Sequence, residues 1–223
     1  IIPPIGKIEL AAELRRLVRL PDSPDLFVYI QFTGGDGTRN HCRRGGKGNL
    51  WIYLYPKKVT PPCAEFKAIT VNDERYKLCG VKSINLLPNV LAAERAADMG
   101  CDEAIFIRDG YVTECAHSNI SLLYKGQLLT APTDGKILPG VSRAHLISVC
   151  ESMDIPCIQQ PFGARMLFAA DEVIITSSGV PCTPCVEIDG ERVGGKAGGV
   201  LASLQDMLYK QYELVCAIDR HAD

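Results

Sequence analysis

The sequence predicts an α+β protein. Short apolar segments, several of them joined by Asp-Gly or Lys-Gly pairs, indicate strands and hairpins, and other segments repeat apolar residues at helical spacing. The strands and helices do not alternate regularly, which argues against a doubly wound sheet. The proline-rich stretch PKKVTPPC predicts a domain boundary, so we expect a small domain over residues 1–60 and a larger one over residues 61–223.

The small domain is expected to contain one helix and two strands. Residues 8–20 carry apolar side chains at helical spacing and run into PDSPD, which would stop a helix. Residues 26–33 and 50–55 are rich in aromatic and β-branched side chains, which predicts two strands joined by a glycine-rich loop.

The large domain is expected to combine hairpins with helices. Turn pairs at residues 109–110, 125–126 and 189–190 predict three hairpins, since such pairs favour tight turns between strands. The predicted hairpins span residues 102–115, 118–132 and 185–193. Periodicity further predicts strands at 67–73 and 171–178 and helices at 89–100, 141–155 and 199–215.

Composition argues against several classes of protein. The net charge of -2 gives no basic surface for nucleic acid or acidic lipid. No apolar run reaches the roughly 18 residues that span a bilayer, and the first residues lack the features of a signal peptide. We therefore expect a cytoplasmic protein that binds neither nucleic acid nor membrane.

Ten cysteines are scattered along the chain. Only Cys182 and Cys185 form a C-x-x-C pair, and without a second pair or a nearby histidine they do not predict a metal site. Pro181 and Pro184 predict a proline-shaped loop around this pair. We expect reduced thiols that pack as small apolar side chains, and a redox or metal module is the least favoured alternative.

Lys82 carries the one charge in the stretch LCGVKSINLLPNVLAA, residues 78–93. A lone lysine of this kind often lays its stem on apolar surface and keeps its amine in water. The functional alternative is a desolvated amine that forms a Schiff base with a carbonyl compound. Lys82 alone does not decide between them, so the choice depends on groups elsewhere in the chain.

Two further stretches together predict a phosphate site. In ILPGVSRAHL, a Pro-Gly turn precedes Ser142 at the start of a predicted helix, where free backbone N–H groups favour an anion. In IITSSGVP, a predicted strand ends in hydroxyl residues that include Ser177 and Ser178. Each stretch alone also fits an ordinary helix cap or turn. Together they suit pyridoxal 5'-phosphate, a carbonyl cofactor that binds a lysine and carries one phosphate.

Glu114 lies at the end of a predicted strand, in YVTECAHSN. By itself it fits a carboxylate that faces solvent. Beside Lys82 it also fits the acid that keeps a pyridine nitrogen protonated, so that the ring draws electrons from a substrate carbanion.

These motifs occur in the order found in the fold-type IV pyridoxal-phosphate enzymes. The segment VKSINLLPNVLAAERAADMGCDEAIFIRDGYVTECAHSNI strongly resembles the part of that family that runs from the catalytic lysine past the pyridine-binding glutamate. The family includes D-amino acid aminotransferases, branched-chain aminotransferases and aminodeoxychorismate lyases. The resemblance implies an incomplete small α/β domain, a larger α/β domain with a pseudo-barrel of strands, and a homodimer.

The resemblance also implies a role for each site residue. Lys82 would hold the cofactor through a Schiff base and carry the substrate proton. Glu114 would bind the pyridine nitrogen, Arg75 would support the cofactor, and Leu138 would pack on its ring. The phosphate-binding residues would be Val141, Ser142, Ser177 and Ser178.

Arg39 and His41 form an R-x-H pattern that resembles the substrate-carboxylate trap of D-amino acid aminotransferases. A guanidinium fork beside an imidazole suits a carboxylate. We therefore expect transamination between a D-amino acid such as D-alanine and a 2-oxo acid such as 2-oxoglutarate. The alternatives are an aminodeoxychorismate lyase, a branched-chain L-amino acid aminotransferase and a non-catalytic remnant of the fold.

One part implied by the resemblance is not found. Family members carry roughly sixty more residues ahead of the R-x-H loop, a length that a domain of ordinary size accommodates. That part would complete the small domain and supply a phosphate-binding arginine and an active-site tyrosine. We expect the chain to start partway through a longer protein, the alternative being a protein that has lost part of its site.

Overall fold

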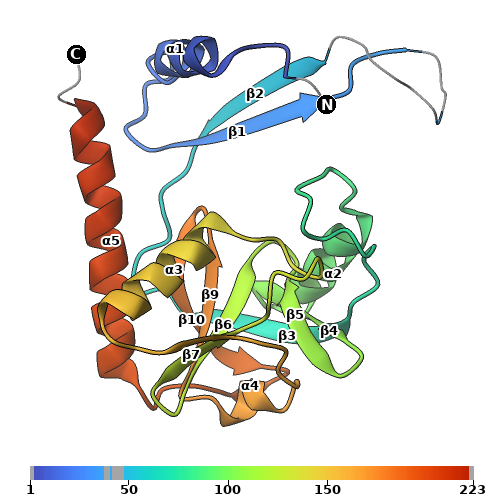
Figure 1. The fold of residues 1–223 in the computed structure, drawn as a ribbon, viewed down its shortest axis with the longest axis vertical. Helices are drawn as coiled ribbons and strands as arrows, with labels where there is room; N and C mark the ends of the chain where they lie inside the picture. The colour runs from blue at the N-terminus through green and yellow to red at the C-terminus, as the bar shows by residue number, and fades with distance from the viewer. Residues whose placement is uncertain (1–2, 38–40, 42–47, 221–223) are drawn as a thin grey trace. The chain divides into compact units, whose positions relative to one another are not determined.

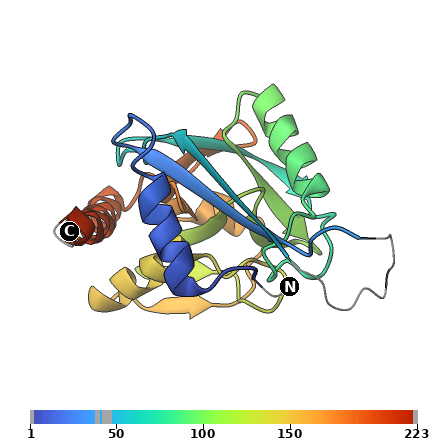
Figure 2. The same cartoon turned by 90° about the horizontal axis from the view of Figure 1, so that it is seen from above.

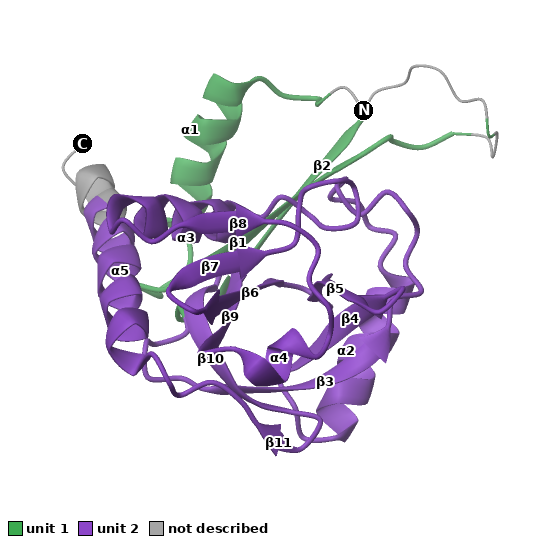
Figure 3. Ribbon diagram, turned by 60° about the horizontal axis from the view of Figure 1, so that its bottom comes forward, with its two compact units in different colours: residues 1–59 green, residues 60–223 purple. Residues whose placement is uncertain are grey.

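The structure is a computed structural model that describes residues 3–37, 41 and 48–220, with side chains up to residue 214. Its backbone divides into two compact units, Ile1–Val59 and Thr60–Asp223 (Figure 3). Each unit contains a sheet of its own.

The first unit holds a helix and a two-stranded sheet, which confirms the three predicted elements (Figures 1 and 2). The helix α1 (Lys7–Leu17) starts after Gly6, whose N–H donates to Glu9 Oε2 at 3.0 Å. Strand β1 (Leu26–Thr33) pairs antiparallel along its whole length with β2 (Asn49–Pro56).

The second unit is built on a nine-stranded mixed sheet that curls toward a barrel (Figure 1). Eight strands follow the order β5-β4-β3-β10-β9-β6-β7-β8, and β11 pairs with β10. The neighbours β3–β4, β10–β3 and β7–β8 are parallel, and the other pairs are antiparallel. The bounds are β3 (Phe66–Asn72), β4 (Glu103–Arg108), β5 (Tyr111–Cys115), β6 (Asn119–Tyr124), β7 (Gln127–Thr130), β8 (Cys157–Gln159), β9 (Glu172–Ser177), β10 (Val180–Ile188) and β11 (Glu191–Arg192).

Three tight turns confirm the predicted hairpins. Both central residues of each turn have positive φ, which is the geometry that suits the twist of two antiparallel strands. The φ values are 54° and 82° at Asp109-Gly110, 51° and 77° at Lys125-Gly126, and 52° and 81° at Asp189-Gly190. The first turn sends the chain back along β4, so that β5 carries Glu114 into the interior.

Helices cover the outer face of this sheet and form two apolar clusters with it. Another apolar cluster fills the inside of the curled sheet. α2 (Leu87–Asp98) packs its buried alanines against β3 and β4. α3 (Val141–Ser152) and α5 (Gly198–Arg220) share an apolar cluster with β9 and β10. The short α4 (Met166–Ala169) adds Leu167 to the inner cluster. Within the described residues, none of the helices has the length and apolar character needed to cross a membrane.

The predicted loop around Cys182 and Cys185 is wrong, because both residues lie in strand β10. The register of β10 with β9 shifts around Pro181, and a bulge of this kind admits a residue that has no N–H to donate. The two thiols belong to different apolar clusters, and burial raises the pKa of each to about 12. The described cysteines are all free, and the expected packing of thiols in apolar surroundings is confirmed for the four buried ones, Cys115, Cys150, Cys182 and Cys185, but not for the exposed Cys63.

Candidate active site

Glu114 lies near the end of β5, and only 6% of its surface is exposed. Its Oε1 accepts a hydrogen bond and ion pair from Arg75, and its Oε2 accepts hydrogen bonds from Asn119 Nδ2 and from the Leu138 N–H, both at 3.0 Å. These three donors come from chain segments that are far apart in sequence. The solvent-facing carboxylate that a lone glutamate would suggest is therefore wrong for Glu114.

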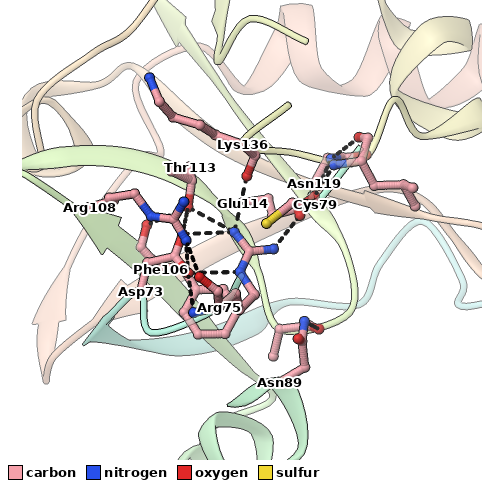
Figure 4. A network of polar contacts seen from close by, with 12 residues as sticks. Asp73, Arg75, Cys79, Asn89, Phe106, Arg108, Thr113, Glu114, Asn119 and Lys136 are labelled. Atoms are coloured by element: carbon pink, nitrogen blue, oxygen red, sulfur yellow. Dashed lines mark hydrogen bonds and ion pairs between the residues drawn. The ribbon is translucent and has the colours of Figure 1, made fainter. Parts of the chain in front are cut away.

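Arg75 follows β3 and reaches Glu114 across the end of the sheet (Figure 4). Its Nε and one terminal nitrogen donate to the two carboxylate oxygens of Asp73, each at 2.9 Å. The guanidinium also lies 4.4 Å from the ring centroid of Phe106, a distance at which a cation is attracted to the aromatic face. Arg75 is thus held between two carboxylates and one ring.

Burial and ion pairing act against each other in this cluster. Burial raises the pKa of Glu114 above its ordinary value, and the charge of Arg75 reduces but does not cancel that rise. Burial also acts to raise the pKa of Asp73, but the hydrogen bonds from Arg75 and Thr113 outweigh it and hold that pKa below its ordinary value. The two carboxyl groups that share Arg75 therefore differ in how readily they take up a proton.

Asn119 links Glu114 to the start of α3. Its Nδ2 donates both to Glu114 and, at 2.9 Å, to the carbonyl of Leu138. Its Oδ1 lies so close to Gly140 that a Cβ at position 140 would overlap it. The glycine of the Pro-Gly turn therefore leaves room for the amide that orients Glu114.

The start of α3 and the end of β9 meet, as the phosphate hypothesis requires. The hydroxyl of Ser142 donates to the carbonyl of Ser177 at 2.8 Å. No side chain caps α3 at its N-terminus, so the first-turn N–H groups are available to an anion. Ser178 and Val141 are exposed beside this junction.

Lys82 lies in an exposed segment between β3 and α2. This segment begins beside the loop that carries Leu138, since the N–H of Cys79 donates to the carbonyl of Gly135 at 3.0 Å. Val81 and Ile84 are also exposed. The apolar neighbours of Lys82 in sequence therefore do not enclose its amine, contrary to the reading of a desolvated lysine.

The predicted carboxylate trap falls in the first unit. Arg39 lies outside the described residues, and His41 is an exposed turn residue. Their role in binding substrate stays a prediction.

Four residues of the cluster around Glu114 are not among the predicted site residues, namely Asp73, Arg108, Thr113 and Asn119. Asn119 belongs to the quoted motif ending in S-N, so that motif was a signal for it. Asp73 and Arg108 gave no such signal, because charged residues at the ends of strands usually face solvent. The structure instead buries the Asp73 side chain and leaves that of Arg108 only 14% exposed, and the two pair at 2.9 Å.

The family profile described as "Amino-transferase class IV" matches residues 1–188 of this chain. The chain belongs to the class IV aminotransferases. The D-alanine aminotransferase of Staphylococcus haemolyticus is 37% identical over 210 residues, which cover 92% of this chain and 74% of that relative. The D-alanine aminotransferase of Bacillus licheniformis is 34% identical over 201 residues, covering 88% and 70% of the two chains.

Solved structures show the fold of class IV aminotransferases in this chain. A branched-chain aminotransferase from Thermoproteus uzoniensis matches with a TM-score of 0.85 at 24% identity, covering 94% of this chain and 72% of that one. A putative 4-amino-4-deoxychorismate lyase from Legionella pneumophila matches with a TM-score of 0.82 at 23% identity, covering 92% and 77%. The predicted fold-type IV architecture is confirmed.

Class IV aminotransferases use pyridoxal 5'-phosphate, and the described residues fit this group. The uncapped start of α3 provides N–H donors for a phosphate, and the junction of Ser142 with Ser177 places hydroxyl groups beside it. Glu114 provides a buried carboxylate for a ring nitrogen.

Proposed function

We propose that this class IV aminotransferase transfers an amino group between a D-amino acid, such as D-alanine, and a 2-oxo acid, such as 2-oxoglutarate. One observation carries the assignment of the site. The N–H of Leu138 binds Glu114, and only three residues later the chain enters the uncapped start of α3. A buried carboxylate and an anion site held this close suit the two ends of one phosphorylated pyridine ring. The 37% identity to a D-alanine aminotransferase supports the D-amino acid substrate.

The residues of the large unit divide the work as follows. Bound pyridoxal phosphate supplies a ring that draws electrons from the substrate Cα, which makes its proton acidic. Lys82 supplies the amine that holds the cofactor, and it takes the proton from Cα and returns it. Glu114, supported by Arg75, keeps a proton at the ring nitrogen. Leu138 would pack on the ring, and Val141, Ser142, Ser177 and Ser178 would bind the phosphate.

Arg39 and His41 are proposed to bind the substrate carboxylate. A guanidinium can meet both carboxylate oxygens at once, which fixes the orientation of the amino acid as well as its charge. Orientation decides which face of Cα meets Lys82, so these two residues would select the enantiomer.

An assay of the purified protein with added pyridoxal phosphate tests this function. D-alanine with 2-oxoglutarate should give pyruvate and glutamate, whereas L-leucine with 2-oxoglutarate should react far more slowly. Lys82→Ala should abolish both the reaction and the visible absorbance of the bound cofactor. Faster use of L-leucine, or pyruvate released from aminodeoxychorismate without any amino acceptor, would contradict the proposal.

We also propose a homodimer that works in the cytoplasm. Eight large apolar side chains are exposed within residues 76–91, more than an isolated surface usually presents in one stretch. They are Tyr76, Leu78, Val81, Ile84, Leu86, Leu87, Val90 and Leu91. Contact with a second copy would cover them, and the free thiols suit a reducing compartment.

A further inference from the structure

One guanidinium serves two carboxylates in this site. Arg75 donates through Nε and one terminal nitrogen to Asp73, and through its other terminal nitrogen to Glu114. The group carries a single positive charge and its donors lie in a fixed plane. The more firmly one of the two carboxylates holds Arg75, the less the guanidinium stabilises the charge of the other carboxylate and the fewer well-aligned hydrogen bonds it can donate to it.

Asp73 is itself held by further groups. Its side chain is fully buried, at 0% exposure, and its Oδ1 also forms an ion pair with a terminal nitrogen of Arg108 at 2.9 Å. The hydroxyl of Thr113 donates to its Oδ2 at 2.9 Å. Arg108 and Asp73, followed by Arg75 and Glu114, form a row of alternating charges, which Figure 4 shows from close by.

We propose that Asp73, held by Arg108, is a positioning residue that sets the basicity of Glu114 by dividing the charge of Arg75. The inference rests on the proposed function, in which Glu114 keeps a proton at a pyridine nitrogen. A glutamate with Arg75 to itself would be a weak proton acceptor. A buried glutamate without Arg75 would have a pKa raised so far that it would already be protonated before the pyridine ring was bound. Asp73 keeps Glu114 between these limits.

The other titratable groups near Glu114 do not supply this effect. The thiol of Cys79 lies in the segment before Lys82, and that of Cys115 is next in sequence to Glu114. Burial raises the pKa of both, so both are neutral at physiological pH. The charges that act on Glu114 in this cluster are those of Arg75 and Asp73, and Arg108 acts through its ion pair with Asp73.

Carbon-13 NMR of the glutamate carboxyl groups tests the proposal on the protein without cofactor. The Glu114 signal is identified by its loss in Glu114→Gln, and its titration midpoint is then followed in two variants. Asp73→Asn frees Arg75 for Glu114, so the midpoint should move to lower pH. Arg108→Gln leaves Asp73 with Arg75 as its remaining ion-pair partner, so the midpoint should move to higher pH. A residue with a merely structural role would not produce shifts of opposite sign.

A double-mutant cycle shows whether the effect passes through Arg75. In an Arg75→Gln background, most of the shift caused by Asp73→Asn should disappear. Lys67→Gln removes an exposed ion pair with Glu187 and serves as the matched control, with no shift expected at Glu114. If Asp73→Asn does not fold, Arg108→Gln carries the same test, because its side chain is 14% exposed and less enclosed than that of Asp73.

An unchanged midpoint in Asp73→Asn or Arg108→Gln, or an equal shift with and without Arg75, would overturn the proposal. The result does not depend on cofactor binding. Failure of the wild-type protein to bind pyridoxal phosphate would count against the proposed function, and it would leave the charge division between Asp73 and Glu114 as measured.

Discussion

Glu114 keeps its place through three donors, and its substitution tests the role of its charge. Glu114→Gln preserves the shape but replaces one of the two acceptor oxygens by an NH2 group, so that either Arg75 or the Asn119 Nδ2 and Leu138 N–H donors lose their acceptor. The transaminase kcat should fall roughly 10²- to 10³-fold, as when a preorganised electrostatic group is removed. The free energy of unfolding should fall by about 1–3 kcal/mol, because buried donors lose an acceptor.

Glu94→Gln, on the exposed side of α2, is the control for this substitution and should change neither quantity. Steady-state kinetics and urea unfolding measure the two effects. If Glu114→Gln retained the wild-type kcat, the assignment of Glu114 to the ring nitrogen would be wrong.

Acid should weaken the fold through Asp73. Because the folded-state pKa of Asp73 lies below its ordinary value of 3.8, its contribution is complete above that value and is lost as the pH falls through the folded-state pKa. Asp73→Asn should therefore lower the free energy of unfolding at about pH 7 and have much less effect at about pH 2. Asp206→Asn, which breaks an exposed pair with Lys210, should matter little at either pH.

Urea unfolding at the two pH values measures this difference. If the wild-type protein and Asp73→Asn lost the same free energy of unfolding on acidification, Asp73 would not be the source of this pH dependence.

At the scale of elements, turn chemistry was the best guide from sequence to structure. Asp109-Gly110 and the two similar pairs place residues that tolerate positive φ where each hairpin reverses, and all three hairpins formed as predicted. The loop predicted around Cys182 and Cys185 failed because a strand can take proline at a bulge. The elements α4 and β8 were missed because four and three residues are too few to show a period.

The site was predictable where local motifs carry it and unpredictable where distant contacts do. Ser142 and Ser177 were selected as one phosphate site, and the structure brings them together. The buried row of charges behind Glu114 was not foreseen, because it depends on which ends of β3 and β4 lie side by side. That pairing is a property of the folded sheet, and the sequence alone gives no distance between Asp73 and Arg108.

The glycine before α3 should not tolerate a side chain. In Gly140→Ala the new Cβ would overlap Asn119 Oδ1 and force the amide or the helix start to move. We expect a loss of about 1–3 kcal/mol in the free energy of unfolding, typical of overpacking, and weaker binding of pyridoxal phosphate. Gly199→Ala in α5, where a Cβ meets nothing within 4 Å, should be neutral or stabilising.

Thermal unfolding and a titration of cofactor absorbance compare these two glycine variants. Equal stability of Gly140→Ala and Gly199→Ala would mean that Asn119 moves without cost and does not fix Glu114.

At the scale of the whole molecule, the exposed apolar segment before and within α2 should decide the oligomeric state. Leu87→Glu places a charge among these side chains and should convert a dimer to a monomer, as measured by light scattering after size exclusion. Ile8→Glu, at a residue of α1 that is 87% exposed, is the matched control and should leave the mass unchanged. A monomeric wild-type protein would contradict the proposed dimer.

The hydrogen bond between Ser142 and Ser177 also sets the stage of synthesis at which the proposed anion site can be complete. The ribosome makes Glu114 and the whole of α3 before it makes β9, and the two serines are 35 residues apart in sequence. A nascent chain that ends after α3 carries the carboxylate and the helix start but not the strand end that completes the anion site. The proposed anion site is complete only once β9 has paired with β6 and β10, so cofactor binding at that site would report a correctly closed sheet.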